Sequence, residues 1–208
     1  MSVSQIVMNS LMAGYGDMAL AGVGVAMKIV MITGMISMGI GQGVQPLLGY
    51  AVGAKTWDRF KQIMKFSFGF ATILGVVLTA LYYVFVNQIA GAFLSEAKSL
   101  SYAVEFSRIL LTTSALFGIF YVLTNSLQAM GAAKASLFIN VSRQGVLYIP
   151  ALFILKYTLG ITGLAWSQPI VDVISIVVAF MLYFKVSRKL MSKKDDDELD
   201  TEKALNCN

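Results

Sequence analysis

The chain alternates between long apolar runs and short polar connections. Four of the apolar runs reach the roughly 20 residues that a helix needs to cross a bilayer. They lie at residues 63–87, 103–130, 135–157 and 160–184. This pattern predicts an all-α, polytopic membrane helix bundle.

Two further segments precede these four. The apolar run at residues 18–50 is longer than a bilayer requires, so it is expected to tilt or kink at Pro46 and to project from one face. Residues 1–13 supply only about two thirds of a span before the turn at residues 13–17. We therefore expect one lobe of five full spans and one truncated span that lacks its cytoplasmic end.

Composition supports a membrane protein. Of the 208 residues, 57% are hydrophobic and 13% are charged, whereas about a quarter are charged in soluble proteins. Six of the eleven acidic residues fall in the last fourteen positions. We accordingly predict a membrane lobe at residues 1–186 and a charged cytoplasmic tail at residues 187–208, and we interpret the net charge of +5 as loop lysines and not as a nucleic-acid surface.

The residue types also exclude several kinds of chemistry. The chain has no histidine, and its single cysteine, Cys207, lies in the tail. A histidine-based metal site, a histidine general base and a cysteine nucleophile paired with histidine cannot be built from such a chain. Neither an enzyme nor a metal site is expected.

Basic residues predict the orientation. Three, Lys98, Arg108 and Lys156, lie on one set of alternate connections. The ten on the other set are Lys55, Arg59, Lys61, Lys65, Lys134, Lys185, Arg188, Lys189, Lys193 and Lys194. By the positive-inside rule the larger set is cytoplasmic, which places the carboxyl terminus inside the cell.

The most informative segment runs from Gly39 to Lys55. It reads Gly39-Ile40-Gly41-Gln42-Gly43-Val44-Gln45-Pro46-Leu47-Leu48-Gly49-Tyr50, followed by Ala51-Val52-Gly53-Ala54-Lys55. It resembles the Gly-Gln-x-x-Gln-Pro-x-x-Gly-Tyr-x-x-Gly-Ala-Lys signature of the multidrug and toxic compound extrusion (MATE) family. That family carries the signature in the second helix of each of its two six-helix lobes, and here it occurs once.

Other stretches resemble the carboxy-terminal lobe of MATE proteins in family order. They lie at residues 6–29, 125–131, 142–150 and 160–172. The resemblance implies half of a twelve-helix transporter of the plasma membrane, in which sodium or proton entry drives export of small organic cations and drugs. The implied partners are the lipid bilayer and either a missing amino-terminal lobe or a second copy.

The resemblance does not extend to a coupling site. Known members carry their coupling carboxylates in the first helix of the amino-terminal lobe or in the seventh and tenth helices. In this chain the span that resembles the tenth helix has Glu105 only near its outer end, and the span that resembles the seventh lacks its cytoplasmic part. No coupling carboxylate of the family is therefore carried over to a residue here. A separate departure is Ala51-Val52, where the family often has Asn-Tyr. No cofactor is expected beyond sodium or a proton as the coupling ion.

Three ionisable residues lie well inside predicted spans and away from their ends, where a charge needs a partner or a water-filled cavity. Arg143 and Asp172 lie about fourteen and twelve residues from the same external turn, so they are expected at similar depth. They are interpreted as a structural ion pair, with Asp172 as a proton- or sodium-responsive group as the alternative. Lys28 either snorkels or binds backbone carbonyls, or it faces the cavity and contributes to gating.

Polar amides provide the remaining pathway candidates. They are Gln5, Asn9, Gln42, Gln45, Asn125 and Gln128. The last four are expected to bond between helices in preference to touching substrate, whereas both roles remain open for Gln5 and Asn9.

Methionine recurs along one helical face at Met27, Met31, Met35 and Met38. This soft side chain suits a pocket for varied ligands, but a lipid-facing or packed apolar stripe is the favoured interpretation. Gly39 and Gly43 are expected to permit close helix packing.

Two other functions are considered. A lipid-linked oligosaccharide flippase of the same superfamily would be expected to show more cationic cavity residues than Lys28 and Arg143. A non-transporting membrane subunit that packs against a partner is the second alternative. An intramembrane enzyme is least favoured, because no metal site or carboxylate pair can be assembled.

Overall fold

The computed structural model describes residues 3–94 and 96–206, with side chains described for residues 4–94 and 96–190. Within these ranges the chain is helical and has no strand, so the expected all-α bundle is confirmed. The elements are α1 (Val3–Ala13), α2 (Asp17–Gly53), α3 (Trp57–Phe93), α4 (Ala97–Leu111), η1 (Ser114–Leu116), α5 (Phe117–Ala129), α6 (Ala133–Val141), η2 (Ser142–Val146) and α7 (Tyr148–Asn206). Cys207 lies outside the described residues.

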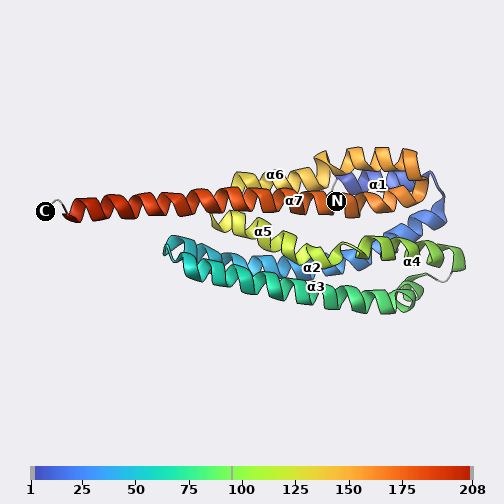
Figure 1. The fold of residues 1–208 in the computed structure, drawn as a ribbon. Helices are drawn as coiled ribbons and strands as arrows, with labels where there is room; N and C mark the ends of the chain where they lie inside the picture. Colours follow the sequence, from blue (N-terminus) through green and yellow to red (C-terminus); the bar gives the residue numbers. More distant parts are fainter. Residues whose placement is uncertain (1–2, 95, 207–208) are drawn as a thin grey trace.

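Element α7 contains two helices joined by a tight turn. Gly160 adopts φ 62° and ψ −133°, a backbone conformation that glycine tolerates better than other residues. The chain reverses there, and the second helix returns beside the first (Figure 1). Four apolar stretches are long enough to cross a membrane, and because the last of them, residues 133–190, reverses at Gly160, the lobe has five full passes plus α1.

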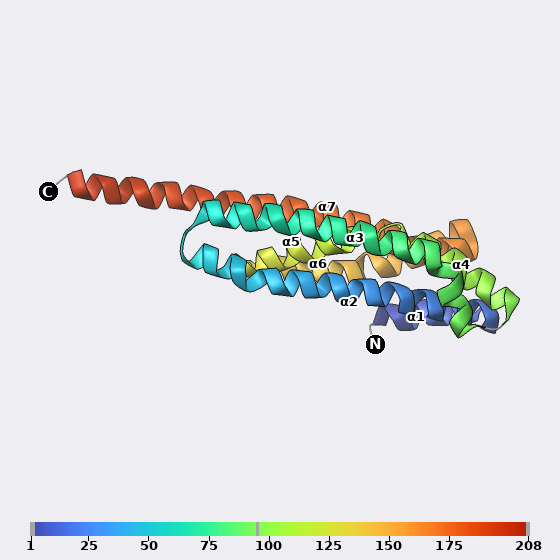
Figure 2. The same ribbon diagram turned by 90° about the horizontal axis from the view of Figure 1, so that it is seen from below.

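Helix α2 passes through Pro46 without a break in its helical assignment. Both α2 and α3 contain 37 residues, which corresponds to about 55 Å of helix against a hydrocarbon core of about 30 Å. The expected projection from one face therefore follows from length. The second helix of α7 continues beyond the rest of the bundle (Figure 2), and the predicted domain boundary at residue 187 stays a prediction.

One predicted span is interrupted, which the apolar pattern did not indicate. The segment expected as a single helix at residues 103–130 is divided into α4, η1 and α5. Hydroxyl groups bond back to the preceding turn at the break: Thr112 Oγ1 donates to the carbonyl of Ile109 at 2.6 Å, and Ser114 Oγ donates to that of Leu111 at 2.8 Å. Such local bonds compete with a regular helix and bend it.

The helices form two groups. Helices α2 to α5 pack mainly on one another, and α1, α6, η2 and α7 form the second group beside them (Figure 1). The α2–α3 and α5–α6 connections lie at the same end as the carboxyl terminus, whereas the α1–α2 turn, the α3–α4 connection and the reversal within α7 lie at the other (Figures 1 and 2). This arrangement collects the larger basic set at one end.

Candidate functional site

A cavity of about 300 Å³ lies between the two helix groups. Its wall is largely apolar, with thioether, aromatic and amide side chains and one guanidinium. The lining residues that the structure describes are Ser4, Gln5, Met27, Val30, Met31, Gly34, Met35, Met38, Leu110, Phe117, Tyr121, Arg143, Gln144, Tyr148 and Gln168. An apolar pocket with a few convergent polar groups is the usual form of a small-molecule site.

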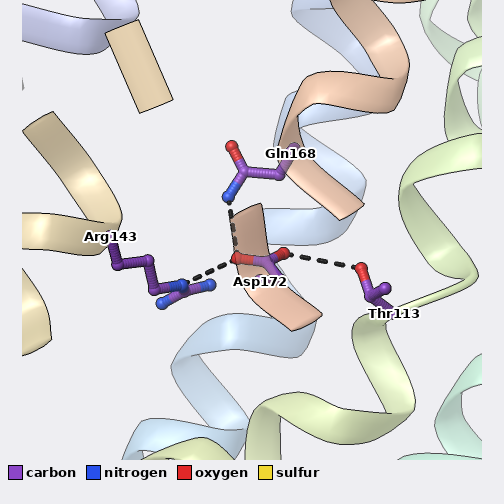
Figure 3. A network of polar contacts seen from close by, with 4 residues as sticks. All are labelled: Thr113, Arg143, Gln168 and Asp172. Carbon is purple, nitrogen blue, oxygen red and sulfur yellow. Dashed lines mark hydrogen bonds and ion pairs between the residues drawn. The ribbon is translucent and has the colours of Figure 1, made fainter. Parts of the chain in front are cut away.

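Asp172 is the centre of a polar network beside this cavity (Figure 3). Arg143 Nε donates to Asp172 Oδ1 at 2.7 Å, and the two side chains are 9% and 1% exposed. Gln168 Nε2 approaches the same oxygen at 3.3 Å, and Thr113 Oγ1 approaches Oδ2 at 3.4 Å. The carboxylate therefore contacts η2, α7 and the break between α4 and α5.

Each member of the network lies at or near an irregular turn or a proline of a helix. Arg143 lies in the π-helical turn η2, where Leu147 N donates to Ser142 O at 2.8 Å. Asp172 follows Pro169, which has no N–H for the carbonyl of Ala165. Thr113 lies between α4 and η1. Such distortions are frequent at functional sites, because they reorient side chains that a regular helix would fix.

Two phenyl rings also hold the guanidinium. The Arg143 Cζ atom lies 4.5 Å from the ring centroid of Phe120 and 5.1 Å from that of Phe117. Both distances fall within the range of cation–π attraction. Because both rings belong to α5, Arg143 of the second helix group packs against a helix of the first group.

The arginine and aspartate that the sequence places at similar depth are thus in direct contact. They lie 29 positions apart, which would separate them by about 43 Å along one straight helix. Only the reversal at Gly160 permits the contact. Whether Asp172 also responds to a coupling ion stays a prediction.

Of the predicted pathway residues, Gln5 alone lines the cavity, and Arg143, which was predicted as an ion-pair residue, lines it as well. Asn9 is exposed on α1 outside the lining set. Lys28 is also exposed, with Nζ 5.9 Å from the ring centroid of Phe93. Lys28 does not line the cavity of this lobe, and both its snorkelling role and its role in gating stay predictions.

Of the other amides, Gln45 and Gln128 form contacts between helices away from the cavity. Gln45 Nε2 donates to Gln128 Oε1 at 3.3 Å, and Gln128 Nε2 donates to Ser136 Oγ at 2.9 Å. Asn125 Nδ2 donates to the carbonyl of Tyr121 at 2.8 Å. Gln42 is exposed on α2. The bonds of Gln45 and Gln128 join α2, α5 and α6.

The methionine face was interpreted as a lipid-facing or packed apolar stripe, and the structure places it differently. All four of its members line the cavity, and Met31 and Met35 are 62% and 64% exposed. Met31 and Met35 are therefore not packed in the core, whereas Met27 is partly buried against it. Period alone could not distinguish a lipid face from a cavity face, because both are apolar and follow the same helical spacing.

Most of the polar residues that line the cavity were not predicted from the sequence. Gln144 and Gln168 lie next to or one turn from the ion pair, and the Ser4 hydroxyl donates to the Gln144 carbonyl. Their positions beside Arg143 and four residues before Asp172 were a usable signal, since such neighbours share a face or a turn. Tyr121 and Tyr148 gave none, because an aromatic residue within an apolar span is equally compatible with packing.

The profile of the MatE family matches residues 1–154. The chain therefore belongs to the MATE family of efflux transporters, and its apolar passes make it a multi-pass membrane protein. Among the residues that the structure describes, no group of three or more His, Cys, Asp or Glu side chains is placed to hold a metal ion.

Relatives and solved structures agree with the family. The multidrug export protein MepA of Staphylococcus saprophyticus is 29% identical over 194 residues, which cover 93% of this chain and 43% of MepA. MepA of Staphylococcus haemolyticus is 28% identical over 195 residues, with 93% and 42% covered. The MATE transporter VcmN of Vibrio cholerae in its bent form shares the fold, with a TM-score of 0.82 and 21% identity over 90% of this chain and 43% of VcmN. The chain thus spans less than half the length of these relatives.

Proposed function

We propose that this lobe forms one wall of the transport pathway of a cation-coupled drug antiporter. The observation that supports the proposal is the cavity, whose wall combines four methionines with the rings of Phe117, Tyr121 and Tyr148. Thioethers adapt to ligands of different shape, and aromatic faces attract delocalised cations. MepA, the relative named above, is a multidrug export protein.

Coupling to an ion is assigned to the network around Asp172. Among the described side chains, Asp172 is the one acidic group that is buried. A carboxylate in this position can bind a proton or sodium only if its contacts to Arg143, Gln168 and Thr113 rearrange. Because these contacts join both helix groups, ion entry would be linked to a change in the cavity wall.

The proposal includes a second lobe, either an amino-terminal MATE lobe or another copy of this chain. In this family's architecture a carrier encloses its substrate between two lobes, and one lobe alone would leave its polar inner face against lipid. The exposed methionines, Met31 and Met35, belong to that inner face.

The direct test is ethidium export by an efflux-deficient bacterium. The 208-residue chain produced alone is expected to give no export, and production with an amino-terminal MATE lobe is expected to restore it. The sodium gradient and the proton gradient are then dissipated separately. Export should stop with one of them only, and that one identifies the coupling ion. Active export by the lone chain would show a homodimer and exclude the need for a different lobe.

A matched pair of substitutions tests whether the methionine face belongs to the pathway. Met35→Trp should lower export severalfold because the larger ring fills the cavity. Ile32→Trp serves as control, since Ile32 lies on the same helix and is 50% exposed but does not line the cavity. Equal export by the two variants at equal abundance would remove the cavity from the pathway.

We also propose that the protein resides in the plasma membrane with its carboxyl terminus in the cytoplasm. The larger basic set gathers at one end of the bundle, and such residues are retained on the cytoplasmic side. In a Cys207→Ser background, an impermeant thiol reagent applied outside should label Tyr15→Cys and miss Arg59→Cys and Lys189→Cys. Labelling of Arg59→Cys in intact cells would reverse this orientation.

A flippase for anionic lipid-linked sugars is less well supported. Among the described lining residues Arg143 is the one charged group, and Asp172 balances it. A pyrophosphate ligand would need several uncompensated cations in the pocket.

A further inference from the structure

Aromatic rings connect α3 to the second helix of α7, away from the cavity. Phe68 of α3 stacks on Phe180 of α7 with ring centroids 6.0 Å apart, and Phe180 stacks on Phe184 with centroids 6.3 Å apart. None of these rings lines the cavity. The two helices run beside each other in opposite directions (Figure 2), and Phe184 is 56% exposed. The rings therefore form a row along one outer face of the bundle.

Basic residues continue this row toward the end of the bundle where the carboxyl terminus lies. Lys65 and Lys61 come three and seven positions before Phe68, and Arg188 comes four positions after Phe184. Side chains at spacings of three, four and seven residues lie on one face of a helix. All three basic side chains are exposed. We call the three rings and the three cations together the α3–α7 face.

The cations of the α3–α7 face lie where the apolar runs end. The run in α3 begins at residue 63, and the run in α7 ends at residue 184. Lys61, Lys65 and Arg188 are at most four residues from these ends, which corresponds to about 6 Å along a helix. The cations are therefore at the depth of the phospholipid headgroups, and Phe68 and Phe180 lie at the depth of the acyl chains.

The α3–α7 face carries an excess of positive charge. Among the described side chains at this end of the bundle, Asp58 is the one acidic group, and it forms no ion pair with Lys61, Lys65 or Arg188. The acidic run of the tail begins at Asp195, about 10 Å farther along α7 than Arg188. Exposed cations at headgroup depth, without an acidic partner among the described side chains, are complementary to the phosphate of a lipid.

We propose that the α3–α7 face binds one anionic phospholipid of the surrounding bilayer. The cations bind its phosphate, and the first methylene groups of an acyl chain pack on the exposed ring of Phe184. A zwitterionic phospholipid carries its own cation beside the phosphate, so it gains less from the same three side chains. The inference is independent of the transported substrate, because no residue of this face belongs to the cavity wall.

Binding of two phospholipids with the same acyl chains tests the inference. The probes are dioleoylphosphatidylglycerol and dioleoylphosphatidylcholine, titrated against the purified chain in detergent, and native mass spectrometry measures the affinity for the first bound lipid. The key variant combines Lys61→Gln, Lys65→Gln and Arg188→Gln, which removes the three cations and keeps polar side chains in their place.

The control variant removes the same number of charges from the same two helices. It combines Arg59→Gln, Lys185→Gln and Lys189→Gln, at three exposed positions at the same end of the bundle. Arg59 comes nine positions before Phe68, which places it on the opposite side of α3. Lys185 and Lys189 each follow a member of the α3–α7 face by one position, about 100° around the helix.

The key variant should bind phosphatidylglycerol at least about 10-fold more weakly, because three cations near one phosphate are lost. Its affinity for phosphatidylcholine should stay within about 2-fold of the original, and an unchanged circular dichroism spectrum shows that it has folded. The control variant should keep its affinity for phosphatidylglycerol within about 3-fold of the original.

Equal losses in the two triple variants would show an attraction set by net charge alone, and equal affinity of the original chain for both lipids would show no recognition of charge. Either result would overturn the inference. Displacement of phosphatidylglycerol by an equal concentration of glycerol 3-phosphate would overturn it as well, since the face would then be a site for free phosphate esters.

Discussion

Asp172→Asn should destabilise the folded lobe by about 3–5 kcal/mol in detergent, because it leaves the Arg143 guanidinium buried without its counter-charge. Arg143 is 9% exposed and bonds Asp172 at 2.7 Å, so water from the cavity can replace only part of the lost interaction. The measurement is the free energy of unfolding from a denaturant titration, with helical content followed by circular dichroism.

A double-mutant cycle determines whether the two charges act as a unit. Adding Arg143→Gln to Asp172→Asn should recover part of the loss, since two amides can bond each other without a net charge. Glu105→Gln is the matched control: Glu105 is exposed on α4, and its substitution should cost less than about 0.5 kcal/mol. Strictly additive losses would show that no coupling exists between Arg143 and Asp172.

Gly41→Leu should disrupt the contact between α2 and α5, with a cost of about 3 kcal/mol or more from overpacking. A Cβ atom at Gly41 would lie 2.6 Å from Asn125 Nδ2 and 2.9 Å from the carbonyl oxygen of Tyr121. The second of these is backbone and cannot move aside as a flexible side chain does.

The control for Gly41 is two residues away on the same helix. A Cβ atom at Gly43 would have nothing within 4 Å, so Gly43→Leu should leave stability unchanged or raise it by up to about 1 kcal/mol through helix propensity. Thermal unfolding of both variants in one detergent gives the comparison. Similar melting temperatures would mean that α2 and α5 do not pack as closely as described.

The glycines of α2 show where the prediction of helix packing from the sequence was wrong. The spacing of Gly39 and Gly43 predicted the close helix contact, yet a Cβ atom at either position would meet no neighbour within 4 Å. The contact is made at Gly41 instead. Small-residue spacing indicates which helix faces can approach one another, but which face meets a neighbour depends on helix rotation in the assembled bundle.

The membrane passes and the ion pair could be predicted from the sequence for a physical reason. Apolar length fixes a membrane span, and the burial cost of a charge requires a partner at similar depth, so Arg143 and Asp172 could be matched by counting from one turn. The break at Thr112 and the π-helical turn at Ser142 were not predicted. Hydroxyl residues occur in regular membrane helices as well, and only tertiary packing decides where the helix gives way.

The three helix distortions that meet at Asp172 also divide the bundle mechanically. At η1, at η2 and at Pro169 the regular ladder of backbone hydrogen bonds is already interrupted, so bending there breaks few additional bonds. We therefore expect each of these spans to bend more easily near the depth of the cavity than elsewhere. Rocking of the outer parts of these spans against the inner parts would change the cavity's shape while the packed ends of the lobe keep their form.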